Sequence, residues 1–188
     1  MSISALDEQT ALIVIDLQAG TVANPAAQPA GEVVARACEL LAAFRGRELL
    51  VVLANVEGTP AGRTEYSEGT RNFPPDWTQL LPELGLQPDD VTLTRRTWSA
   101  FAGTGLAALL KDRGVTQVVL AGMATTFGVE STARDAYHLG FNVVLALDAI
   151  TDPNPEAHHH SATRVFPALG QTGQASEIIK LLDERWAS

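Results

Sequence analysis

The stretch Gln117-Val-Val-Leu-Ala-Gly-Met-Ala-Thr-Thr-Phe-Gly-Val129 decides the fold of this chain. Residues 117–121 form an apolar run, which predicts a buried β-strand. Residues 126–139 follow with a helical pattern that Gly140 closes, as glycine does beyond many helix C-termini. A strand that turns directly into a helix directs backbone N–H groups at a ligand. Because Gly128 has no side chain, we expect no thiolate chemistry from this turn.

Apolar runs alternate with amphipathic helical patterns along the rest of the chain. This alternation predicts an α/β fold: a three-layer, doubly wound, mostly parallel six-stranded sheet with helices on both faces. Ligands of such folds bind beyond the C-terminal ends of the strands. The predicted strands are 11–15, 49–54, 90–94, 117–121, 142–147 and a short one near Gln171, and the predicted helices are 31–45, 104–113, 126–139, 155–166 and 176–186.

Residues 57–88 interrupt this alternation with a stretch rich in glycine, proline and charge. We expect a long excursion over the surface, with a short helix near residues 77–81. Loops of this length often serve as lids or interface segments.

Length and charge limit the possible classes of protein. The 188 residues fit one domain, 1–188, with a sizeable core. A net charge of −9 argues against nucleic acid or an anionic membrane as the main partner. The charge says little about a small-molecule substrate, which is the partner that we expect. The only cysteine, Cys38, excludes an intrachain disulfide framework. The absence of a signal-like segment and of a long apolar run leads us to expect a cytoplasmic protein.

Three polar features follow predicted strands and should meet at one edge of the sheet. Asp16 comes directly after the run Ala-Leu-Ile-Val-Ile, where a carboxylate is costly unless it is paired or functional. Arg95 and Arg96 end the third strand, ahead of Trp98 and Phe101, and could hold an anionic substrate or pair with Asp16. The third feature is the turn 122–129, whose N–H groups form a candidate oxyanion or carboxylate site.

Together these segments resemble the isochorismatase-like hydrolases, often called cysteine hydrolases. The resemblance covers nearly the whole chain and implies an Asp–Lys–Cys catalytic set. Asp16 matches the aspartate, whereas Arg95 stands at the lysine position and Gly128 at the cysteine position. The resemblance also implies a cis peptide at Met123–Ala124 and a homo-oligomer, either a dimer or a tetramer. We expect substrate contacts from the residues around this set: Gln18, Trp98, Phe101, Met123, Ala124, Thr125 and Phe127.

The two departures narrow the mechanism that the resemblance implies. Gly128 removes the thiol, so we expect a hydrolase that works without a covalent thiol intermediate, such as a vinyl-ether hydrolase with Asp16 as acid or base. A general acid needs a raised pKa, and a guanidinium in contact with Asp16 would instead favour the carboxylate. The segment 55–59 also lacks the Ala-Gln-Pro run of dedicated isochorismatases, which argues against isochorismate itself as the substrate.

Two alternatives stay open. The chain could be a catalytically impaired family member that serves in ligand binding or assembly. It could also be an amidase that uses a hydroxyl of Thr125 or Thr126, although nothing nearby in the sequence activates one.

No metal or other cofactor is expected. The metal-binding relatives use histidines ahead of the lysine strand, and here no histidine precedes His138. Because consecutive helical residues point in different directions, His158, His159 and His160 cannot all face one ion. We expect one of them to pack against the region of Asp148.

Overall fold

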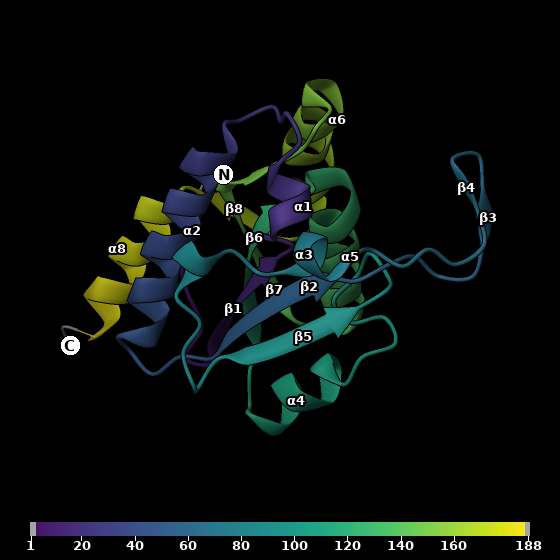
Figure 1. Ribbon diagram of the computed structural model, residues 1–188. Coiled ribbons are helices and arrows are strands. Elements are labelled where there is room, and N and C mark those ends of the chain that lie inside the picture. The colour runs from purple at the N-terminus through teal and green to yellow at the C-terminus, as the bar shows by residue number, and fades with distance from the viewer. Residues whose placement is uncertain (1–2, 187–188) are drawn as a thin grey trace.

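One six-stranded parallel sheet forms the centre of the protein. The computed structural model describes residues 3–186. The strands lie in the order β5-β2-β1-β6-β7-β8, and every neighbouring pair is parallel (Figure 1). Their bounds are β1 Thr10–Ile15, β2 Val51–Val56, β5 Val91–Arg95, β6 Gln117–Met123, β7 Asn142–Thr151 and β8 Gln171–Gly173.

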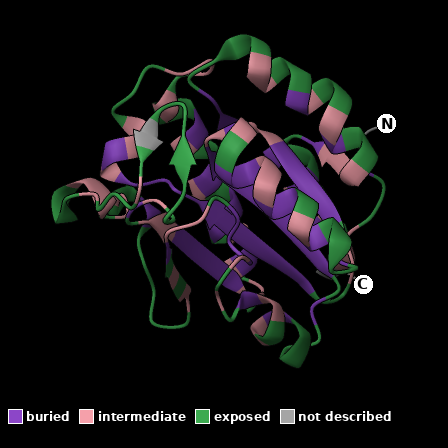
Figure 2. Ribbon diagram, turned by 90° about the vertical axis from the view of Figure 1, so that its right-hand side faces the viewer, coloured by how far each residue is buried: buried purple, intermediate pink, exposed green. Residues whose placement is uncertain are grey.

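Helices cover both faces of this sheet, which confirms the predicted doubly wound α/β architecture. Helices α2 (Ala30–Arg45) and α8 (Ala175–Trp186) bury apolar stripes against one face. Helices α4 (Leu106–Asp112), α5 (Glu130–His138) and α7 (Phe166–Leu169) cover the other. Because both faces are covered, β1 and β6 are buried along their whole length, as Figure 2 shows in purple.

Several element boundaries differ from the sequence prediction. Strand β2 extends through Asn55 and Val56, and β7 continues four residues beyond Leu147, because both gain backbone partners on neighbouring strands. The predicted helix 155–166 divides into α6 (Pro155–His160), the π-helical turn η3 (Ser161–Val165) and α7. A short helix, α1 (Ala19–Val22), was not predicted.

The excursion after β2 begins with a hairpin that stands away from the body of the protein. Strands β3 (Arg63–Thr64) and β4 (Ser67–Glu68) pair antiparallel at its far end. We call residues 58–72 the arm; it projects to the right in Figure 1. The chain then returns to the body through α3 (Pro75–Thr78) and the 3-10 turn η1 (Pro82–Leu84). The sequence indicated the excursion but not its hairpin form.

Candidate active site

A buried ion pair joins two of the three predicted features at the C-terminal edge of the sheet. Asp16 follows β1, and Arg95 is the last residue of β5, two strands away. Arg95 Nη1 donates to Asp16 Oδ1 at 2.6 Å, and Nη2 donates to Oδ2 at 2.9 Å. The side chains are only 1% and 8% exposed, respectively. The long arginine side chain therefore spans the end of β2 and binds the carboxylate with a bidentate geometry.

A backbone carbonyl holds the other side of the same guanidinium. Arg95 Nε and Nη2 donate to the Trp98 carbonyl oxygen at 3.3 Å and 2.9 Å. Burial raises the pKa of Asp16 above its ordinary value, while the hydrogen bonds and the charge of Arg95 act in the opposite direction. Because arginine keeps its proton and contacts both carboxylate oxygens, we take the two groups to be an ion pair at neutral pH.

The backbone of Asp16 has an unusual conformation. Its φ angle is +48°, in the left-handed region that residues with a Cβ rarely adopt. The Asp16 N–H donates to the Ala54 carbonyl at 2.8 Å, and its own carbonyl accepts from the Thr21 hydroxyl. These two bonds fix the direction in which the carboxylate leaves β1.

Gly128 lies directly against the ion pair. A Cβ at this position would lie 2.7 Å from Ile15 Cγ2, 3.2 Å from Asp16 Oδ2 and 3.3 Å from Arg95 Nη2. A cysteine would therefore be crowded by Ile15 and by both members of the pair. The Arg95 guanidinium thus lies beside the space that a side chain at position 128 would need.

The turn that carries Gly128 is held from β7. The Met123–Ala124 peptide is cis, as the resemblance implied, and residues Thr125–Val129 form a π-helical turn, η2, that continues into α5. The buried Asp152 carboxylate accepts from the Thr126 N–H at 2.8 Å and from the Thr126 hydroxyl at 2.7 Å. Asp152 was not among the predicted site residues, since it lies 26 positions from its partner.

A histidine contacts the neighbouring threonine. The Thr125 hydroxyl lies 2.8 Å from His158 Nδ1, and His158 Nε2 lies 3.4 Å from the Gln28 side chain. Burial lowers the pKa of His158, so the neutral ring is favoured. No residue nearby in the sequence was expected to activate a turn hydroxyl, and the group that contacts Thr125 is brought from α6, 33 positions along the chain. One of the three histidines was expected near Asp148. His158 contacts Gln28, whose side chain donates to the carbonyl of Leu147, the residue before Asp148.

Two aromatic side chains frame the site on the surface. The rings of Trp98 and Phe127 meet edge to face with centroids 4.9 Å apart. They are 57% and 45% exposed, which is unusual for large apolar side chains. Both were predicted to contact substrate, and both lie on the segments that carry the ion pair and the turn.

Other predicted contact residues have structural positions. The Gln18 amide is buried and pairs with the N–H and the carbonyl of Val56, as a strand neighbour would. Phe101 stacks on Phe141 in the core, with ring centroids 5.9 Å apart. Met123 is buried in the opposite core. The described contacts of these three side chains are with the protein itself, and their substrate contacts stay a prediction. Ala124 is partly exposed, and Thr125 is buried against His158.

Within residues 3–186, no three histidine, cysteine, aspartate or glutamate side chains gather closely enough to hold a metal ion. No helix in the same range is long and apolar enough to cross a membrane.

Comparison with known proteins shows the family of this chain. A family model described as the isochorismatase domain matches residues 10–177. The uncharacterized isochorismatase family protein YwoC of Bacillus subtilis is 37% identical, with 92% of this chain and 94% of YwoC covered. The ureidoacrylate amidohydrolase RutB of Methylobacterium radiotolerans is 30% identical, with coverage of 84% and 73%. The structure of an isochorismatase family protein from Burkholderia thailandensis is 40% identical, with a TM-score of 0.92 over 97% of this chain and all of that one. The chain belongs to the isochorismatase family of hydrolases.

Proposed function

We propose that this protein hydrolyses a small molecule without a covalent enzyme intermediate, with ionised Asp16 as the general base that activates water. The observation that carries the proposal is the buried bidentate pair of Asp16 and Arg95, with Gly128 packed against it. A family hydrolase that lacks the thiol must use water directly or use another side chain, and Asp16 is the carboxylate at the centre of the site.

The ion pair favours a base over an acid. Protonation of a vinyl ether requires Asp16 to carry a proton, but both of its oxygens accept hydrogen bonds from a permanently charged group. An ionised Asp16 can instead take a proton from water as the water attacks a carbonyl carbon. When the bond to the leaving group breaks, the same proton passes to that group. An acyl or carbamoyl substrate fits this sequence, and the amidohydrolase RutB shows that relatives act on such bonds.

The turn that begins at Thr125 is the part of the site that favours negative charge on the substrate. The continuous helical segment that starts at Thr125 has its N-terminal end at the edge of the site, where the helix dipole favours negative charge, and the Asp152 carboxylate already accepts from its Thr126 N–H. Arg95 is already balanced by Asp16, so we assign the stabilisation of a developing oxyanion, or of a substrate anion, to the turn. Trp98 and Phe127 flank the same edge and could contact the rest of the substrate.

A second candidate is a family member without catalytic activity, which binds a ligand or assembles with other chains. This candidate is favoured by the hydrogen bonds of Arg95. Its guanidinium donates to Asp16 and to the Trp98 carbonyl, so it is already bound within the protein and is not directed at a substrate. A hydroxyl route through Thr125 has the support of His158 at 2.8 Å, but the threonine is fully buried.

One experiment separates these candidates. The wild type and Asp16→Asn are assayed against a panel of vinyl ethers, esters, amides and carbamoyl compounds, and the intact protein mass is recorded during turnover. The proposal predicts turnover of a carbonyl compound by the wild type alone, with no mass adduct. Equal turnover by Asp16→Asn contradicts the base role, an adduct on Thr125 supports the hydroxyl route, and inactivity across the panel supports the binding protein.

A further inference from the structure

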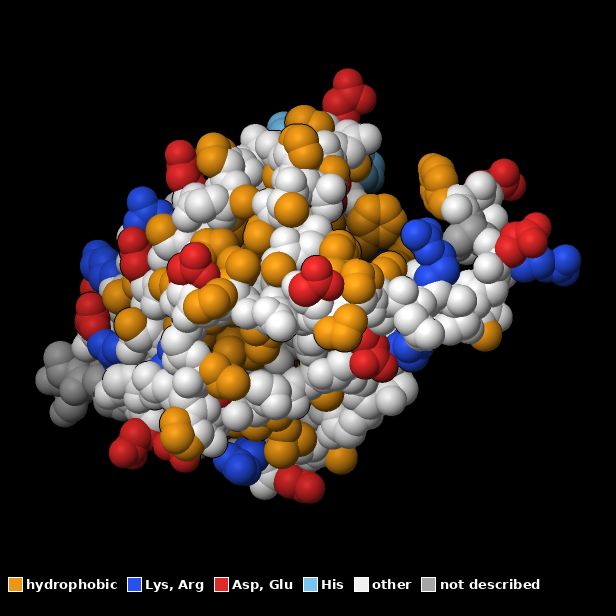
Figure 3. All heavy atoms as spheres, in the orientation of Figure 1, with side chains coloured by type: hydrophobic (Ala, Val, Ile, Leu, Met, Phe, Trp, Pro, Cys, Tyr) orange, Lys and Arg blue, Asp and Glu red, His pale blue; other side chains and the backbone are white. Residues whose placement is uncertain are grey.

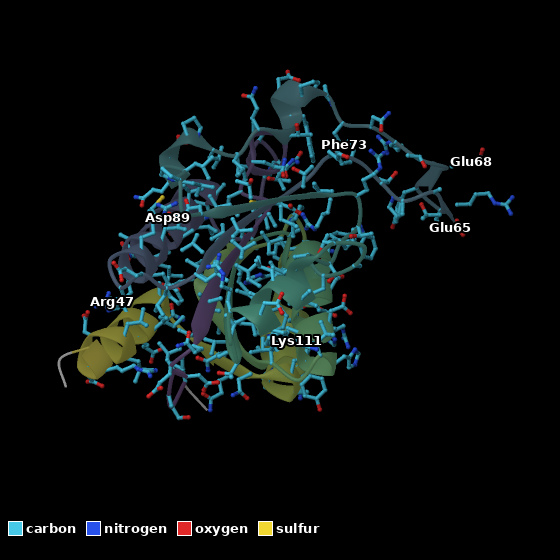
Figure 4. The ribbon with its side chains drawn as sticks, turned by 90° about the horizontal axis from the view of Figure 1, so that it is seen from below. Arg47, Glu65, Glu68, Phe73, Asp89 and Lys111 are labelled. Atoms are coloured by element: carbon cyan, nitrogen blue, oxygen red, sulfur yellow. The ribbon has the colours of Figure 1, made fainter. Side chains whose placement is uncertain are left out.

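The arm, residues 58–72, projects from the body of the molecule (Figure 1). Its described residues from 60 to 66 are all exposed, and Tyr66 at the turn of the hairpin is 96% exposed. Figure 4 shows Glu65 and Glu68 at the far end of the arm, well beyond Phe73, where the chain returns to the body. An isolated two-stranded hairpin is marginally stable in water, so an arm of this kind needs a surface to pack on.

The base of the arm is built rigidly. Arg96 Nη2 donates to the Arg71 carbonyl at 2.8 Å and to Asn72 Oδ1 at 2.7 Å. The Thr59 N–H donates to the same Arg71 carbonyl at 2.9 Å. Gly58 is required there, because a Cβ would lie 2.2 Å from that carbonyl oxygen. The arm is therefore held in a fixed direction at its base, although its tip lies far from the body.

The exposed aromatic pair lies close to that base. Arg96, which fastens the arm, is two residues from Trp98, and Trp98 contacts Phe127. Figure 3 shows hydrophobic side chains on the body beside the arm, and another one among the charged side chains of the arm. The eight Cα–Cα steps from Gly58 to Tyr66 can span at most about 28 Å. One molecule therefore has an exposed aromatic side chain on the arm and an exposed aromatic pair near the base of the arm.

We propose that the arm packs against a second copy of this chain, with Tyr66 of each copy on Trp98 and Phe127 of the other. The charges of the arm favour an identical partner: Arg63 and Arg71 are balanced by Glu65 and Glu68, so two arms related by a twofold axis offer both signs to each other. Aromatic rings are also the side chains most enriched at the centres of such interfaces.

This arrangement adds a residue to the candidate site. Trp98 provides the carbonyl that holds Arg95, and Phe127 precedes Gly128, so a tyrosine packed on their rings would form one wall beside the ion pair. The inference goes beyond the proposed function and does not depend on it, because it holds equally for a protein without catalytic activity.

Disulfide trapping between separate molecules tests the contact. In a Cys38→Ser background, one batch carries Tyr66→Cys and a second carries Phe127→Cys, and the two are mixed and mildly oxidised. A disulfide between the two batches can only join different molecules. The proposal predicts a mixed dimer, identified by the mass of its two different subunits. Tyr66→Cys mixed with Lys180→Cys, on the exposed face of α8, is the matched control and should give no such product.

Sedimentation gives a second, independent measurement. Tyr66→Ala changes a fully exposed side chain, so the fold should be unaffected, and the dissociation constant of the dimer should rise by about 30-fold or more. Circular dichroism checks the fold. Failure of the Phe127→Cys mixture to exceed the Lys180→Cys mixture would overturn the proposal, as would a monomeric wild type. An intrachain link in a Tyr66→Cys/Phe127→Cys double variant, without the mixed dimer, would likewise contradict it by placing the arm on its own body.

Discussion

Strand β5 has an arginine–aspartate pair at each end, one partly buried and one buried, and the two pairs have different surroundings. At its start, Arg45 Nε and Nη2 donate to the two oxygens of Asp90 at 3.1 Å and 2.6 Å. At its end, Arg95 binds Asp16 with the same bidentate geometry. The first pair is completed by the Gln87 N–H, which donates to Asp90, and by the Leu84 carbonyl, which accepts from Arg45. It fastens α2 to the loop before β5.

The second pair combines features that the first lacks. Asp16 has a left-handed backbone, and the Cα of Gly128 packs where a side chain would collide with the pair. Hydrogen bonds to Asp152 and His158 hold the turn, and they keep Gly128 close to the ion pair. A bidentate ion pair alone is thus only a structural device. The glycine turn and the exposed aromatic rings beside the Asp16 pair distinguish it as the candidate site.

The largest expected difference between the pairs is in catalysis. Asp16→Asn removes the proposed base, so turnover of any substrate found should fall by about 10²- to 10⁴-fold. Asp90→Asn changes the equivalent carboxylate at the other end of β5 and should leave turnover per folded molecule nearly unchanged. Steady-state rates, corrected for the folded fraction, measure both variants. Comparable losses in the two variants would mean that the ion pairs act through stability alone.

Stability should separate the two arginines next. Arg95→Ala leaves a buried carboxylate without its partner and should lower the free energy of unfolding by about 3–5 kcal/mol. Arg45→Ala should cost less, about 1–3 kcal/mol, because the Arg45 side chain is 14% exposed and Asp90 keeps the Gln87 N–H. Urea unfolding measures both. A larger loss for Arg45→Ala would contradict this assignment of the more deeply buried pair.

The glycine beside the Asp16 pair gives a smaller, sharper test. Gly128→Ala introduces a Cβ at 2.7 Å from Ile15 Cγ2 and should cost about 1–3 kcal/mol. Gly31→Ala, in the first turn of α2, meets no atom within 4 Å and is the matched control. It should be neutral or stabilising, by up to about 1 kcal/mol, because alanine loses less backbone freedom than glycine. Equal effects in urea unfolding would show that the space beside the ion pair is not restricted.

The smallest expected effect is a pH dependence on the turn side of the site. Because the folded-state pKa of His158 is lowered, the unfolded chain binds more protons between that pKa and about 6.5. The contribution of His158 to stability is therefore complete above pH 6.5 and is lost as the pH falls through this window. His158→Gln should remove this component, while His160→Gln, at an exposed position, should retain it. Thermal unfolding between pH 5 and 7.5 should show slopes that differ between the two variants; identical slopes would refute the assignment. We expect less than about 1 kcal/mol, since the ring is only partly buried.

The sequence predicts the central residues of this site better than the residues that hold them in place. Asp16, Arg95 and the turn could be placed together because each follows a strand, and parallel strands end at a common edge. Asp152 and His158 could not, since their partners lie 26 and 33 positions away and neither stands in a recognisable motif. The buried positions of Gln18 and Phe101 could not be predicted either. Both lie near site residues in the chain, but Gln18 hydrogen-bonds to the backbone of Val56 and Phe101 stacks on Phe141 in the core. The arm was indicated only as an excursion, because its hairpin has two residues per strand.

The ionisation of Asp16 is the central claim, and the carboxyl ¹³C chemical shift of this residue tests it most directly. The resonance is assigned by its absence in Asp16→Asn and followed from pH 8 to pH 3, with Asp90 as the internal comparison. We predict the shift of a carboxylate at pH 7, with protonation only at lower pH. The shift of a protonated carboxyl group at pH 7 would contradict the account and return Asp16 to the role of a general acid.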